Sequence, residues 1–140
     1  MTHSIAKWLS AYLWIAGSCD ASTGVLLICA PHATLRLMGI RPEVVPSEII
    51  GFLGAFVLAV GLSYLYAAIL SGSLKNQQAV EAVWIVTAVT RSSVAVYVTF
   101  KLAAGILEPG WGSVAATDAL FAGFQWLALG LDWLKPKGGP

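Results

Sequence analysis

The chain has 140 residues, of which 58% are hydrophobic and 11% are charged, and its net charge is +1. Soluble domains carry about 25% charged residues, so a soluble chain of this size could not bury so much apolar surface. The small net charge and the lack of a basic run argue against nucleic-acid binding. Composition therefore predicts a single membrane domain over residues 1–140.

Four apolar stretches are long enough to cross the roughly 30 Å hydrocarbon core of a bilayer as helices. They are residues 8–30, 47–70, 79–104 and 113–134. The first is too long for a signal peptide. A loop with three prolines follows it over 31–46, and the other connections are short. Short connections make neighbouring helices antiparallel, so the predicted fold is all-α, an integral membrane up-down-up-down four-helix bundle.

One small-residue stripe marks the second stretch. Gly51, Ala55 and Ala59 recur every four residues, a spacing that places them on one helix face. Small residues let a neighbouring helix approach closely in a membrane. We expect this stripe to be a packing face.

Basic and aromatic residues indicate the orientation. Lysines on the side of the termini outnumber the basic residues Arg36, Arg41 and Lys101 on the other side, which favours cytoplasmic termini. These lysines are Lys7, Lys75, Lys135 and Lys137. Aromatic residues at the same end are expected to form an interfacial belt. They are Trp8, Tyr12, Tyr64, Tyr66, Trp84 and Trp133.

Arg91 lies near the middle of the third stretch, and its guanidinium is always charged. At a bilayer midplane it costs about 3 kcal/mol on insertion scales, so it must face the bundle interior and have a partner. At about 1.5 Å per residue, Asp20 lies about 15 Å and Arg91 about 19 Å from the end opposite the termini. Matched depth predicts an Asp20–Arg91 pair.

Lys101 and Asp118 lie nearer that end, and Glu48 lies at its rim. We expect Lys101 to pair with Asp118, which also shares a helix face with Gln125 and Asp132 at spacings of seven. Two interpretations remain open for these buried charges. They either lock the helices in register or line a polar pocket for a small ligand, a lipid headgroup or protons.

Motifs for catalysis and metal binding are missing from the sequence. It has no HExxH, P-loop or GxSxG pattern, so an enzyme is the least supported class. His3 and His32 lie outside the predicted mid-spans, so no metal or haem is predicted. Cys19 and Cys29 face different sides of one helix and cannot form a normal disulfide.

The end of the first stretch, Ala30 to Ile40, reads P-x-x-x-L-x-x-x-G-I from Pro31 onwards. Glu48 then opens a Gly/Ala-rich stretch, Arg91 falls in the third, and Asp118-Ala119-Leu120-Phe121 opens the fourth. This layout resembles small bacterial DoxX-like and related uncharacterised four-helix membrane proteins. The resemblance implies a bacterial inner membrane and, for some relatives, association with quinone-linked redox complexes; it transfers no catalytic residue.

Two functions follow as expectations. The first is an accessory or assembly subunit that associates with membrane lipids and with other membrane subunits or itself, in a larger redox or energy-transducing complex. The alternative is a protein that binds or transports a small molecule, lipid or quinone in a polar pocket around Asp20 and Arg91; a pigment at His32 is a further candidate ligand.

Overall fold

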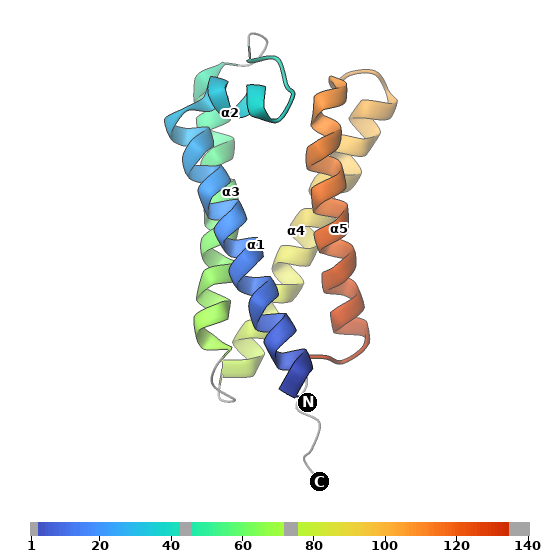
Figure 1. The fold of residues 1–140 in the computed structure, drawn as a ribbon. Helices are drawn as coiled ribbons and strands as arrows, with labels where there is room; N and C mark the ends of the chain where they lie inside the picture. The colour runs from blue at the N-terminus through green and yellow to red at the C-terminus, as the bar shows by residue number, and fades with distance from the viewer. Residues whose placement is uncertain (1–2, 43–45, 72–75, 135–140) are drawn as a thin grey trace.

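The computed structural model describes residues 3–42, 46–71 and 76–134. In these ranges the chain forms helices and the turns that join them, without a β-strand, which confirms the all-helical prediction. The long helices are α1 (His3–Cys29), α3 (Ser47–Leu70), α4 (Gln77–Ala103) and α5 (Gly112–Gly130). A short helix, α2 (Pro31–Leu37), lies at the end opposite the termini (Figure 1).

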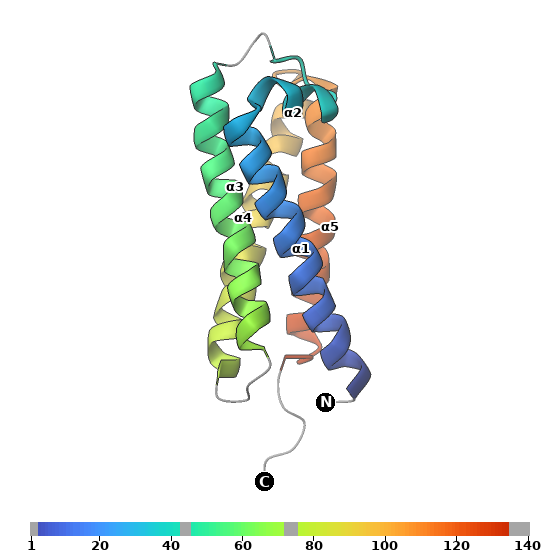
Figure 2. The same ribbon diagram turned by 60° about the vertical axis from the view of Figure 1, so that its left-hand side comes forward.

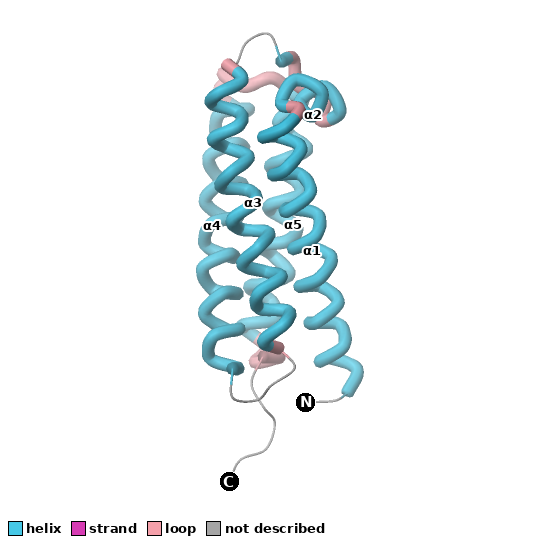
Figure 3. Tube along the Cα trace, turned by 90° about the vertical axis from the view of Figure 1, so that its left-hand side faces the viewer, coloured by secondary structure: helices cyan, strands magenta, loops and turns pink. Residues whose placement is uncertain are grey.

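The four long helices lie side by side and alternate in direction (Figures 1, 2 and 3). α1 packs mainly along α3, and α5 packs mainly along α4, whereas α3 and α4 contact each other less extensively. The molecule is therefore two antiparallel hairpins, α1/α3 and α4/α5, joined side by side.

Three helices among the described residues are long and apolar enough to cross a membrane: Lys7–Cys29, Ser47–Leu70 and Gln77–Ala103. α5 is shorter, with 19 residues, and it carries the polar residues Asp118 and Gln125. The lysines Lys75, Lys135 and Lys137, used above for orientation, lie outside the described residues.

The loop predicted over 31–46 is wrong for its first half, which forms α2. Pro31 stands in the first turn of α2, where its missing N–H costs no hydrogen bond. The helix ends where Gly39 takes a φ of 75° and the N–H of Ile40 bonds to the carbonyl of Leu35. Leu35 and Ile40 are thereby buried against Leu27.

α5 ends four residues before the predicted position. Asp132 takes a φ of 53°, and the N–H of Trp133 bonds to the carbonyl of Ala128 at 3.0 Å. This pattern closes a helix when the residue after its last turn is left-handed, a conformation that Asp tolerates better than most residues. Asp132 is consequently exposed and leaves the face that it was expected to share with Asp118.

The contact between α1 and α3 is closest at glycines spaced by seven on each helix. A Cβ at Gly54 would lie 2.9 Å from the carbonyl oxygen of Gly24, and a Cβ at Gly61 would lie 2.9 Å from that of Gly17. Residues seven apart lie on one helix face, so the four glycines form a seam along which the two backbones touch.

The stripe Gly51, Ala55 and Ala59 takes no part in this seam. Ala55 and Ala59 are exposed, and a Cβ at Gly51 would meet nothing within 4 Å. The expectation that this stripe packs against a neighbouring helix is therefore wrong within the chain. Close approach requires glycine where the two backbones meet. On α3 that face carries Gly54 and Gly61, which are seven residues apart.

Apolar cores lie on either side of the middle of the bundle. The larger one, towards the termini, is formed by Leu9, Leu13, Ala16, Tyr64, Ala67, Ala68, Val80, Trp84, Ala128 and Leu134. The smaller one, near α2, is formed by Leu27, Leu35, Ile40 and Ile50. Tyr64 and Trp84 are fully buried, and Tyr12 packs against Trp84 with ring centroids 5.0 Å apart. The belt expectation is therefore wrong for Tyr64 and Trp84, although Trp8 and Tyr66 are exposed.

The glycine seam predicts a sharp difference between two glycine substitutions in the hairpin. In Gly24→Ala the new Cβ would lie 2.5 Å from the backbone nitrogen of Leu58, which cannot move aside like a side chain. We expect the substitution to lower the free energy of unfolding by about 1–3 kcal/mol. Thermal unfolding of the purified protein in detergent measures the effect.

Gly51→Ala is the matched control, because open space surrounds that position. Alanine favours helix over glycine by up to about 1 kcal/mol, so the control should be neutral or slightly more stable. Equal destabilisation by both substitutions would contradict the seam.

Candidate functional site

Arg91 is the most deeply buried charged residue that the structure describes, with 4% of its surface exposed. It lies on the inward face of α4, one turn from Thr87 and from Ala95, which are also buried. Residues three, four and seven apart share a helix face, so the same pattern that buries these neighbours turns Arg91 inward.

Two carboxylates from different hairpins bind the Arg91 guanidinium. Its Nη2 contacts Oδ2 of Asp20 on α1, and its Nη1 lies 2.5 Å from Oδ1 of Asp118 on α5. The structure thus brings Asp20 and Arg91 together and adds Asp118 to them. Arg91 thus links α1 to α5. Tyr12 of α1 also packs against Phe121 and Phe124 of α5, with ring centroids 5.7 and 4.7 Å apart.

A chain of hydrogen bonds leads from Arg91 through the neutral side chains of the interior. Nε of Arg91 donates to the hydroxyl of Tyr64 at 2.9 Å, and that hydroxyl donates to Oε1 of Gln125 at 3.0 Å. Nε2 of Gln125 donates to Oγ1 of Thr87 at 2.7 Å and to the carbonyl of Trp84 at 3.3 Å. Each polar group of the fully buried Gln125 therefore has a partner, as a buried amide requires.

The guanidinium also lies over aromatic rings. Its Cζ is 4.6 Å from the ring centroid of Phe121 and 5.4 Å from that of Tyr64. Aromatic faces attract cations at such distances, most strongly where water is excluded. We call Arg91, Asp20, Asp118, Tyr64 and Phe121 the Arg91 cluster; its members come from all four long helices.

The expected pairing of Lys101 with Asp118 is wrong. Asp118 binds Arg91, while Nζ of Lys101 lies 5.6 Å from the ring centroid of Tyr97 on its own helix. The prediction from depth failed because it compared positions along the helix axes only. The long side chain of Arg91 reaches Asp118 although the two residues were expected at different depths. Glu48 is exposed at the start of α3 and does not belong to the cluster.

Tyr64 was missed as a partner of Arg91, because its position near the end of α3 suggested an interfacial residue. A signal was present in the sequence: Tyr64 lies three residues after Gly61 and four before Ala68, on the face of α3 that is buried. Gln125 was placed correctly on the face of Asp118, seven residues away.

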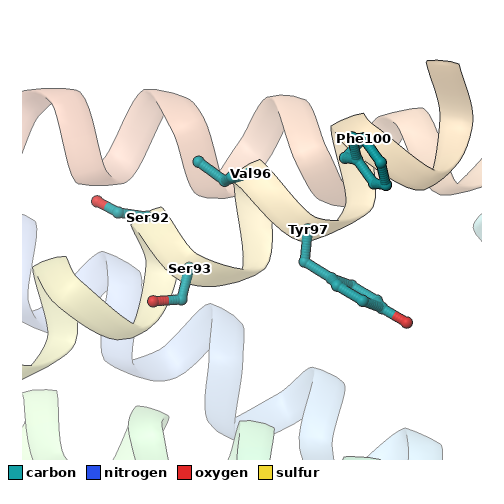
Figure 4. Close-up of a pocket in the computed structure, with 5 residues that line it drawn as sticks. All are labelled: Ser92, Ser93, Val96, Tyr97 and Phe100. Carbon is teal, nitrogen blue, oxygen red and sulfur yellow. The ribbon is translucent and has the colours of Figure 1, made fainter.

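An open hollow of about 520 Å³ lies on the surface of α4. Figure 4 shows the residues that line it, all from that one helix: Ser92, Ser93, Val96, Tyr97 and Phe100. Asp20 and Arg91 do not line this hollow, so it is not the polar pocket that the sequence suggested around them. Within the described residues, no group of three or more His, Cys, Asp or Glu side chains could hold a metal ion.

The hydrogen bonds of Tyr64 predict that its hydroxyl stabilises the bundle. Tyr64→Phe would leave Nε of Arg91 and Oε1 of Gln125 without these partners. Leaving a buried polar group unpaired costs about 1–3 kcal/mol, so the free energy of unfolding should fall by at least that amount. Chemical or thermal unfolding in detergent measures it.

Tyr66→Phe removes the same atom from an exposed side chain on the same helix, and it should change stability by less than about 0.5 kcal/mol. If the two variants were equally stable, the Tyr64 hydroxyl would have no structural role.

Comparison with known proteins gives no relative to which this site can be assigned. No protein-family model, curated protein or solved structure matches the chain. The geometry of the Arg91 cluster and the apolar outer surface are therefore what support a functional proposal.

Proposed function

We propose that the protein is a four-span integral membrane protein that acts by association, as an accessory or assembly subunit of a larger membrane complex. In this proposal the Arg91 cluster fixes the helices relative to one another. The outer helix faces are the surfaces that contact lipid and partner subunits. The observation that carries this proposal is that the charges of Arg91, Asp20 and Asp118 are paired with one another inside the chain.

α5 is the fourth span in this proposal. Its 19 residues extend about 28 Å, close to the hydrocarbon thickness of a bilayer. Asp118 and Gln125, the residues that lower its hydropathy most, both point inward to partners. Ser113 and Thr117 are exposed, and their hydroxyls donate to backbone carbonyls. Its exposed side includes Leu120 and Leu127, so α5 presents apolar groups outward like the other three helices.

Large apolar side chains are exposed along every long helix. They include Ile15 and Val25 on α1, Phe52 and Phe56 on α3, Val86 and Val96 on α4, and Leu120 and Leu127 on α5. A continuous apolar surface of this kind suits lipid tails and the apolar faces of other membrane helices. On α3 the outward stripe Gly51, Ala55 and Ala59 offers a partner helix the closest approach.

A binding or transport role for the Arg91 cluster has less support. A small anion would have to displace Asp20 or Asp118 from Arg91, because these two side chains already bind both of its Nη atoms. The resemblance to DoxX-like proteins favours the first proposal and suggests a redox-linked complex of the bacterial inner membrane as the setting.

The four-span topology predicts that the two ends of α5 lie on opposite sides of the membrane. In a background with Cys19→Ala and Cys29→Ala, Ser113→Cys and Leu131→Cys place one thiol at each end of α5, at exposed positions. A membrane-impermeant maleimide should label them from opposite sides. With cytoplasmic termini, Leu131→Cys is labelled from the cytoplasm.

Ser71→Cys, in the turn after α3, is the control and should be labelled from the same side as Leu131→Cys. Labelling of Ser113→Cys and Leu131→Cys from one side would rule out α5 as a span.

Association predicts species larger than the monomer in native mass spectrometry of gently solubilised membranes. Ala55→Trp fills the outward stripe of α3 without touching the core, and it should weaken the association about tenfold, equivalent to about 1.4 kcal/mol. Ala119→Trp, at an exposed position on α5, is the matched control and should leave the association unchanged. A lone wild-type monomer would refute the proposal.

A further inference from the structure

The Arg91 cluster contains two acidic groups and one basic group. Two carboxylates, from Asp20 and Asp118, face one guanidinium. Tyr64, the third partner, is a neutral phenol that donates its proton to Gln125. With both aspartates ionised, the cluster would therefore hold one uncompensated negative charge in the middle of the bundle.

No other charged group of the described residues removes this excess. Among the described residues, no second cation lies within ion-pair distance of either carboxylate, and Lys101 on α4 contacts Tyr97 instead. The remaining titratable group that packs close by is Tyr12 of α1, whose hydroxyl donates to the carbonyl of Phe121 at 3.4 Å. Glu48 at the rim of α3 is exposed.

An unpaired charge in an apolar interior is so costly that the group usually becomes neutral instead. A carboxylate does so by taking up a proton. A metal cation is a poorer solution here, because the described residues offer no cluster of metal ligands and Arg91 already occupies an oxygen of each aspartate.

We propose that the Arg91 cluster binds one exchangeable proton, shared between Asp20 and Asp118, so that the folded protein holds the trio without net charge. The proposal rests on the membrane placement of the helices described above, because bulk water around the cluster would remove the cost of the extra charge. On uptake the proton joins a carboxylate oxygen, and on release it returns to water. No other bond changes.

The two carboxylates are less enclosed than the guanidinium that they bind. The side chains of Asp20 and Asp118 keep 14% and 16% of their surface exposed, whereas that of Arg91 keeps 5%. Because the two carboxylates are bridged by the same guanidinium, the proton belongs to the pair rather than to one residue.

Infrared spectroscopy of the full-length protein in lipid vesicles tests the proposal. The wild-type protein at neutral pH should show the C=O stretch of a protonated carboxyl group. Glu48→Gln removes a carboxyl outside the cluster and should leave this band unchanged. Asp20→Asn and Asp118→Asn should each abolish the band, because the one remaining carboxylate neutralises Arg91 without a proton.

The double variant Asp20→Asn, Asp118→Asn leaves the guanidinium without a counter-charge, so it should lose most of its folded protein, whereas each single variant folds. Absence of the band from the wild-type protein, or its persistence in both single variants, would overturn the proposal. Wild-type stability that depends on sodium or potassium, with no band, would assign the compensating charge to a metal ion and overturn it equally.

Should the single variants fail to fold, absence of the band from the wild-type protein still overturns the proposal, and its presence at neutral pH in both the wild-type protein and Glu48→Gln supports it. Failure of this proposal is separable from failure of the proposed function. A missing band leaves the maleimide labelling and the native mass spectrum unaffected, whereas labelling of both ends of α5 from one side overturns the membrane topology whatever the spectrum shows.

Discussion

The charge of Arg91 in an apolar interior is the constraint on which the arrangement of the helices depends. A buried ion pair contributes little net stability, but removing one partner is costly, by about 3–5 kcal/mol. Arg91 takes its partners from every other long helix: Asp20 from α1, Tyr64 from α3, and Asp118 and Phe121 from α5. A shift or rotation of any helix would break one of these contacts, so a single residue specifies their common register.

The contacts within the α1/α3 hairpin differ in kind from the contacts between the two hairpins. Within the α1/α3 hairpin, glycines allow the backbones to touch, and the contact depends on shape rather than on charge. Between the hairpins, direct packing is lighter, and the Arg91 cluster provides polar bonds that cross from one to the other. In a membrane this division has a physical reason, because lipid tails compete with apolar helix contacts but cannot replace a hydrogen bond.

The proposed association and the proposed proton use different parts of the same molecule. The outer faces are apolar and leave few polar groups for specificity, so shape, as at the stripe through Ala55, would select a partner. The interior holds the charges away from those faces.

The sequence by itself determined the helical class, the bounds of α3 and the burial of Arg91, because hydropathy and the cost of a permanent charge are local properties. It also paired Asp20 with Arg91 by depth. Only the tertiary structure decided that Asp118 binds Arg91 instead of Lys101 and that Tyr64 lies inside the bundle. It also decided that the glycines spaced by seven, and not the stripe through Gly51, form the seam. These outcomes depend on how each helix is rotated about its axis and on how far each side chain reaches. The depth of a residue along its own helix gives neither.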